Sequence, residues 1–143
     1  LTEACARELN KILPPHDYLI APEAKAIGLV NEMARQAGEK KHFVARKGIK
    51  AYMTDPISVE VHSITTAKVQ TLYLDSKDAA LIKGKRIVIV DDVISTGESL
   101  TAVEELVQKA GGTVVGRAAV LAEGDAADRK DILYLEKLPL FFH

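Results

Sequence analysis

Residues 87–99 of this chain read IVIVDDVISTGES, and this stretch decides the fold. Its four β-branched apolar residues are typical of a buried parallel strand. Two adjacent carboxylates, Asp91 and Asp92, come next, followed by a short loop rich in hydroxyl groups. Apolar positions recur at helical spacing from residue 100 onward, so the pattern predicts a strand, an acidic tip, a loop and a helix N-terminus.

The same stretch has the chemistry of a sugar-phosphate site. Loop N–H groups and the positive end of a helix dipole can bind a phosphate. Asp91 and Asp92 can accept hydrogen bonds from sugar hydroxyls or face a hydrated Mg²⁺. Alternatively, such residues only cap the helix, as at many strand–loop–helix junctions. A cap accounts for one polar residue and leaves a buried pair of carboxylates without donors or a cation, so we favour the ligand site.

The composition indicates one ordinary globular domain. The chain has 143 residues, of which 48% are hydrophobic and 27% charged, and its net charge is −1. This balance argues against nucleic acid or a membrane as a partner, so any phosphate binding must come from local groups. Cys5 is the single cysteine, which excludes an internal disulfide. No signal peptide or membrane span is visible, and we expect a cytoplasmic protein.

Strand-like and helix-like patterns alternate along the chain. We expect helices at 3–12, 22–37 and 99–110, strands at 18–21, 42–45, 86–91, 113–121 and 132–135, and a hairpin formed by 58–64 and 69–74. The apolar face of the second helix is expected to contain Ile27, Val30, Ala34 and Ala37. This order predicts an α/β fold, Rossmann-like, with a parallel sheet flanked by helices. Such a sheet binds ligands at the carboxyl ends of its strands, where the loops 21–25, 46–50 and 91–99 should meet.

At this point the residues resemble a known family. Residues 88–99 look like the phosphoribosyl-pyrophosphate (PRPP) motif of type I phosphoribosyltransferases. Residues 22–25 (PEAK) are similar to the first pyrophosphate loop of the adenine enzymes, and 43–47 (FVARK) to the basic strand end of the adenine and xanthine enzymes. The segment 58–84 matches their mobile hairpin. The resemblance implies a single phosphoribosyltransferase domain over 1–143, with a flexible hairpin at 58–74 and a hood from 1–16 and 136–143.

The resemblance also implies an activity. The enzyme would transfer the 5-phosphoribosyl group from PRPP to a purine base, giving a nucleoside 5′-monophosphate and pyrophosphate. Asp91 and Asp92 would hold the ribose hydroxyls, directly or through water on Mg²⁺, and the family usually forms homodimers. The loop at Ala24 often carries a non-proline cis peptide in this family.

Site residues follow from the same resemblance. The implied catalytic residues are Asp91, Asp92, Lys25 and Lys68. The implied PRPP-binding residues are Glu23, Ala24, Lys25, Arg46, Lys47, Lys50, Asp91, Asp92, Val93, Ile94, Ser95, Thr96, Gly97, Glu98 and Ser99. Metal binding would fall to Asp91 and Asp92.

Two departures leave the acceptor base open. Lys25 stands where the adenine enzymes usually carry arginine, and Thr65-Thr66 stands where their hairpin usually carries a glutamate. Two other readings remain beside the enzyme: a regulator that senses PRPP without turning it over, and a doubly wound domain that does not bind this ligand. The regulator would need a nucleic-acid surface, and no basic helix is present.

Overall fold

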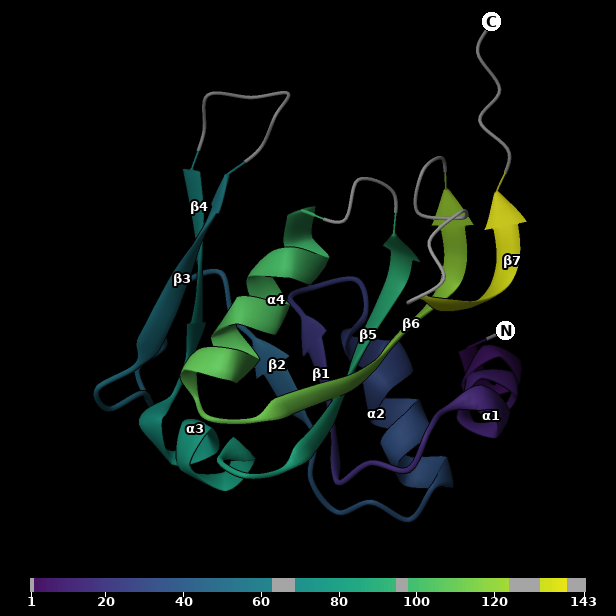
Figure 1. Cartoon of the computed structure of the whole chain (residues 1–143), viewed down its shortest axis with the longest axis horizontal. Coiled ribbons are helices and arrows are strands. Elements are labelled where there is room, and N and C mark those ends of the chain that lie inside the picture. The colour runs from purple at the N-terminus through teal and green to yellow at the C-terminus, as the bar shows by residue number, and fades with distance from the viewer. Residues whose placement is uncertain (1, 63–68, 95–97, 124–131, 139–143) are drawn as a thin grey trace, which may run out of the picture.

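The elements are arranged around one parallel sheet (Figure 1). The structure, a computed structural model, describes residues 2–62, 69–94, 98–123 and 132–138. The elements in chain order are α1 (Thr2–Ile12), β1 (Tyr18–Pro22), α2 (Ile27–Gln36), β2 (Phe43–Ala45), β3 (Ile57–His62), β4 (Val69–Leu74), α3 (Ser76–Ile82), β5 (Arg86–Ile94), α4 (Glu98–Lys109), β6 (Thr113–Glu123) and β7 (Leu133–Leu138).

The sheet has five strands in the order β2-β1-β5-β6-β7, and every neighbouring pair is parallel. This confirms the predicted α/β class. The chain winds from β1 through α2 to β2 in one direction, and from β5 through α4 to β6 in the other. The direction therefore reverses between β1 and β5, and open α/β sheets bind ligands beside such a point.

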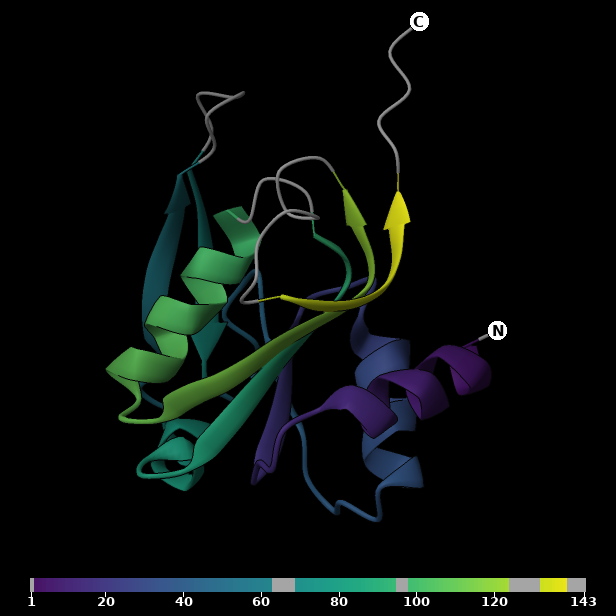
Figure 2. The ribbon, with the colours of Figure 1, turned by 45° about the vertical axis from the view of Figure 1, so that its right-hand side comes forward.

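Both faces of the sheet are covered, as predicted. Figures 1 and 2 show α4 and the β3–β4 hairpin on one side of the sheet, with α1 and α2 on the other. In β5, Ile87 and Ile89 pack in the cluster with α4, whereas Val88 and Val90 pack in the cluster with α1 and α2. Burial of each such side chain contributes about 1.5–3 kcal/mol, which explains why β5 is apolar at every position from 87 to 90.

The predicted hairpin is present. Strands β3 and β4 are antiparallel, from the pair Ile57–Leu74 to the pair His62–Val69. Leu72 and Leu74 of the hairpin are buried against α4, and the Lys109 ammonium donates to the Ser58 carbonyl at 2.9 Å. The base of the hairpin is thus part of the core. Residues 63–68 lie outside the described residues, so the flexibility of the hairpin stays a prediction.

Helix α2 begins later than predicted. It starts at Ile27 rather than at Pro22, because β1 continues through Pro22, which pairs with Ala45 of β2. The buried face of α2 also differs from the predicted one, and Ile27 is only partly buried. Ala37 is exposed, and the buried residues are Leu29, Val30, Met33 and Ala34. The short helix α3 was not predicted, and β5 extends three residues beyond the predicted end at residue 91.

Helix α1 packs on α2. Ala6 and Leu9 are fully buried there, and the Asn10 amide donates to the Met33 carbonyl at 3.0 Å. Residues 136–138 belong to β7, the edge strand, and residues 139–143 lie outside the described residues. The single domain over 1–143 and the hood assigned to 1–16 and 136–143 stay predictions. No helix in the described part of the chain is long and apolar enough to cross a membrane.

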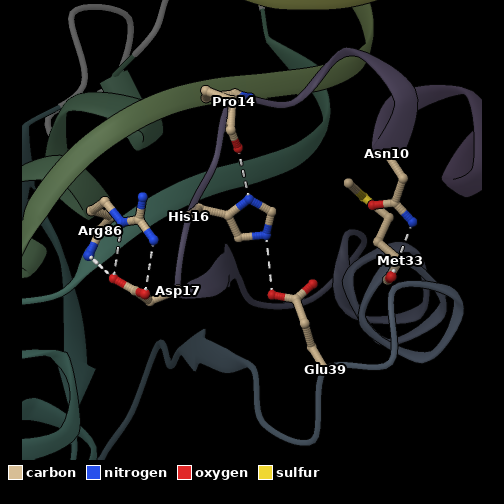
Figure 3. A network of polar contacts seen from close by, with 7 residues as sticks. All are labelled: Asn10, Pro14, His16, Asp17, Met33, Glu39 and Arg86. Carbon is tan, nitrogen blue, oxygen red and sulfur yellow. Dashed lines mark hydrogen bonds and ion pairs between the residues drawn. The ribbon is translucent and has the colours of Figure 1, made fainter.

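Polar contacts fix the edge of the sheet at which β1 and β5 begin (Figure 3). Asp17 accepts the Arg86 backbone N–H at 2.8 Å, and its carboxylate lies 3.2–3.3 Å from the Arg86 guanidinium. The Asp17 N–H in turn donates to the Arg86 carbonyl at 2.8 Å. These contacts set the register of β1 against β5.

Candidate functional site

Strands β1 and β5 separate at their carboxyl ends. Their pairing runs from Tyr18–Ile87 to Ile20–Ile89, whereas β5 stays paired with β6 as far as Ile94. Asp91 and Asp92 therefore lie within β5, beyond its last pairing with β1. The longer strand corrects the prediction that the acids form its tip, because pairing with β6 keeps this segment extended.

A cavity of about 170 Å³ lies at this separation. It collects groups from the loop after β1, the end of β2, the hairpin, β5 and the first turn of α4. The lining residues are Pro22, Glu23, Ala24, Lys25, Lys47, Leu72, Asp91, Asp92, Val93 and Ser99. Described residues from each of the three predicted segments, 21–25, 46–50 and 91–99, line this cavity.

Two of the three carboxylates that line the cavity, those of Asp91 and Asp92, accept hydrogen bonds from neighbouring backbone N–H groups. Asp91 Oδ1 accepts the Asp92 N–H at 2.8 Å, and Asp92 Oδ1 accepts the Val93 N–H at 2.8 Å. Burial, and after it the neighbouring Asp92, raises the pKa of Asp91 to about 7, and the charge of Lys25 opposes the shift. A cation or hydroxyl donors beside the pair would favour the ionised form of Asp91.

The loop after β1 brings Lys25 to the acidic pair. The Glu23–Ala24 peptide is cis, which confirms the expectation for this loop. The Glu23 carboxylate accepts the Lys47 backbone N–H at 2.9 Å and lies 3.5 Å from the Lys50 ammonium. The Lys47 N–H, followed by the charge of Lys50, lowers the pKa of Glu23 against the effect of burial. Lys50 thus reaches the site through Glu23 and does not line the cavity.

Arg46 is not brought to the acidic cavity. Its backbone N–H and carbonyl both bond to Tyr73 of β4, at 2.9 and 2.7 Å. It lines a second cavity of about 530 Å³, together with Lys41, His42 and Lys77. Its Nε is buried and has no hydrogen-bond partner among the described residues. Neighbours on an extended chain face opposite sides, so Lys47 lines one cavity and Arg46 the other.

The remaining predicted residues divide into three groups. Ser99 lines the cavity, and Glu98 lies in the first turn of α4. Ile94 has its side chain buried in the core, 3% exposed. Ser95, Thr96, Gly97 and Lys68 lie outside the described residues. Pro22 and Leu72 also line the cavity but were not among the predicted site residues. Leu72 carries no local signal, because its place depends on how the hairpin packs.

The carboxylate oxygens of the cavity suit a hard cation that is also coordinated by water and by substrate phosphates. No group of three or more potential metal-binding side chains occurs within the described ranges. Mg²⁺ is commonly bound by one or two carboxylates together with water and substrate phosphates. Asp91 and Asp92 therefore fit Mg²⁺ that arrives with a phosphorylated ligand, and do not form a complete protein cage.

Fold and site define a doubly wound α/β domain with an acidic, lysine-flanked cavity at the point where the winding reverses. Residues 5–138 match the family model described as phosphoribosyl transferase domain. The chain belongs to this family, which confirms the resemblance seen in the sequence.

Individual relatives are purine enzymes. The chain is 30% identical over 100 residues to adenine phosphoribosyltransferase of Petrotoga mobilis, covering 70% of this chain and 54% of that protein. It is 30% identical over 129 residues to hypoxanthine/guanine phosphoribosyltransferase of Methanococcus voltae, covering 90% of this chain and 65% of that protein. The chain thus spans between half and two thirds of these two relatives.

A solved structure of the same class superposes on this fold. Adenine phosphoribosyltransferase of Thermoanaerobacter pseudethanolicus aligns with a TM-score of 0.82 and 27% identity. The alignment covers 96% of this chain and 80% of that one.

Proposed function

We propose that this protein transfers the 5-phosphoribosyl group from PRPP to a purine base, releasing pyrophosphate. The observation that carries the proposal is that Asp91, Asp92, Lys25 and Lys47 line the same cavity, beside the first turn of α4. Carboxylates suit ribose hydroxyls, and lysines suit a diphosphate. The purine enzymes among the relatives support the choice of acceptor class.

Each group would have a separate task. Asp91 and Asp92 would accept hydrogen bonds from the ribose hydroxyls and so orient the sugar. Lys25 and Lys47 would stabilise the negative charge that develops on the departing diphosphate. Backbone N–H groups at the start of α4 would bind the 5′-phosphate, with Ser99 beside them. Lys68, Ser95, Thr96 and Gly97 stay predictions within this scheme.

We also propose that the activity requires Mg²⁺. The ion would be held by Asp91 and Asp92, directly or through water, and would neutralise charge on the diphosphate when bound. The single carboxylate pair supports a cation shared with substrate.

We further propose a homodimer. Tyr52 and Leu81 line the second cavity and are 57% and 44% exposed. Aromatic side chains are enriched at protein–protein interfaces, so we take Tyr52 as the candidate centre of a contact between two copies. Sedimentation equilibrium tests this, and a monomer at micromolar concentration contradicts it. A cytoplasmic location stays a prediction.

A panel of bases tests the activity. PRPP and Mg²⁺ are supplied with adenine, hypoxanthine, guanine, xanthine or a pyrimidine, and pyrophosphate release is measured. We expect release with at least one purine and none with the pyrimidine. The double variant Asp91→Asn/Asp92→Asn should lose PRPP binding, whereas the exposed Glu105→Gln on α4 should behave as the wild type.

Two outcomes support the other readings. PRPP binding by calorimetry without release from any base would favour a PRPP-sensing regulator. If PRPP does not bind, or binds the double variant as well as the wild type, the acidic cavity is not the PRPP site and the proposal is wrong.

A further inference from the structure

Pairing between β1 and β2 continues one residue beyond the two strands, in an altered form. The last paired residues are Pro22 and Ala45, and the Glu23 N–H then donates to the Ala45 carbonyl at 2.9 Å. In a parallel ladder, a residue that donates to one partner residue accepts, through its own carbonyl, from the residue two positions further along that partner strand. The regular partner of the Glu23 carbonyl would therefore be the Lys47 N–H.

The Lys47 N–H instead donates to the side chain of Glu23, at 2.9 Å from Oε1. The carboxylate thus replaces the main-chain carbonyl as the acceptor. The main chain is released from the ladder at this residue and turns into residues 23–26, which bring Ala24 and Lys25 to the acidic cavity. The second oxygen, Oε2, lies 3.5 Å from the Lys50 ammonium.

We propose that Glu23 is a positioning residue, whose carboxylate lets the loop after β1 leave the sheet while keeping the basic segment 46–50 docked beside the cavity. The inference rests on the proposed function and gives Glu23 a different task from the PRPP binding that the family resemblance implied. A carboxylate would repel a diphosphate, and both of its oxygens already contact the basic segment.

The effect of removing this carboxylate should be local. Arg46 is held independently by two backbone hydrogen bonds to Tyr73, and Ala45 by the Glu23 N–H. These contacts do not involve the Glu23 side chain, so the sheet and hairpin keep their partners in a Glu23→Ala variant. Lys47 and Lys50 lose the acceptor that fixes them. We therefore expect the variant to displace their positive charges from the cavity while it leaves the fold intact.

Two variants separate the hydrogen bond from the charge. Glu23→Gln retains an oxygen for the Lys47 N–H but removes the charge near Lys50, whereas Glu23→Ala removes both. We expect Glu23→Ala to raise KM for PRPP about tenfold, equivalent to about 1.4 kcal/mol, with a much smaller change in kcat. Glu23→Gln should stay within about threefold of the wild type in KM. Glu105→Ala, exposed on α4, is the matched control for kinetics and for thermal unfolding.

Amide hydrogen exchange at Lys47 tests the positioning without any turnover. The amide should be protected in the wild type and in Glu23→Gln, and should exchange rapidly in Glu23→Ala. If Glu23→Gln is as impaired as Glu23→Ala, the carboxylate acts through its charge and the proposal fails. It also fails if Glu23→Ala melts early with an unchanged KM. If the wild type does not bind PRPP, the proposed function fails. Exchange at the Lys47 amide still tests whether the Glu23 carboxylate holds this N–H.

Discussion

The Nε2 atom of His16 lies 3.0 Å from Oε1 of Glu39, so the segment before β1 is joined to the segment after α2 (Figure 3). The Nδ1 atom of His16 lies 2.9 Å from the Pro14 carbonyl oxygen. A carbonyl can only accept, so we assign a proton to Nδ1. Oε2 of Glu39 is buried without a hydrogen-bond partner among the described residues, and burial raises the pKa of this carboxyl despite the nearby His16.

Glu39 should therefore make stability depend on pH. Because its pKa is raised above the ordinary 4.5, the folded state binds the proton more tightly than the unfolded state. The stabilising contribution is complete below pH 4.5 and is lost as the pH rises through the folded pKa. We expect the difference in unfolding midpoint between the wild type and Glu39→Gln to shift in favour of the variant on going from about pH 5 to about pH 8. A difference that is constant over this range contradicts the assignment.

Asp17 should show the opposite dependence. Hydrogen bonds from the Arg86 side chain and then its backbone lower the pKa of Asp17 to about 2. Its contribution is present above pH 3.8 and is lost as the pH falls through about 2. We expect Asp17→Asn to unfold at a lower temperature than the wild type at pH 7, and the two curves to converge below about pH 2. Melting followed by circular dichroism measures this. The pair is exposed, so the change should be small, and curves that stay equally separated in acid argue against the pairing.

Asp91→Asn should stabilise the fold and weaken the site. The raised pKa of Asp91, about 7, means that ionisation above this pH places a second negative charge beside Asp92 in a partly buried site. The stabilising contribution of Asp91 is complete below pH 3.8 and is lost as the pH rises through about 7. We expect Asp91→Asn to increase the free energy of unfolding by on the order of 1–3 kcal/mol at pH 8, with little change at pH 4. Urea titrations at both values measure this, and calorimetry should show weaker PRPP binding. A variant that is less stable than the wild type at pH 8 would contradict the burial argument.

Gly112 and Gly28 provide a matched pair of glycine-to-alanine variants. A Cβ at Gly112 would lie 2.6 Å from Cγ2 of the fully buried Ile82 and 3.0 Å from Cγ1 of Val107. We expect Gly112→Ala to destabilise the protein by about 1–3 kcal/mol. At Gly28, in α2, a Cβ meets nothing within 4 Å, so Gly28→Ala should stabilise by about 0.5–1 kcal/mol. Equal effects of the two variants in urea unfolding would show that Ile82 and Val107 leave room for a Cβ at Gly112.

Local patterns predicted the strands of the sheet and three of its helices, α1, α2 and α4. Residues 87–90 are apolar at every position and β-branched, which is typical of a strand buried on both faces. The start of α2 was mispredicted because Pro22 and Glu23 are favourable first-turn residues for a helix. In the structure Pro22 instead pairs with Ala45 of β2, and the sequence around Pro22 contains no sign of this distant partner. Helix α3 was missed because seven residues hold too little periodicity.

The candidate site was predicted in outline and corrected in detail. Residues at the carboxyl ends of β1 and β5 and just after β2 do line one cavity, as the alternation of elements indicated. The sequence could not show which of Arg46 and Lys47 lines the acidic cavity, since this depends on the two backbone hydrogen bonds between Arg46 and Tyr73 of the hairpin. The role of the Glu23 side chain could not be predicted either, because Lys47 is 24 residues away.

Local sequence patterns were enough to predict the parallel sheet, an acidic pair at the carboxyl end of one strand, and the family to which both belong. Hydrophobic periodicity and short motifs act over neighbouring residues, so they can be read without knowing which strands meet. The tertiary structure alone decided that Lys47 faces the acids, that Arg46 does not, and that the pKa of Asp91 rises to about 7. These properties depend on burial and on partners brought together by the strand order, and no stretch of the chain encodes them locally.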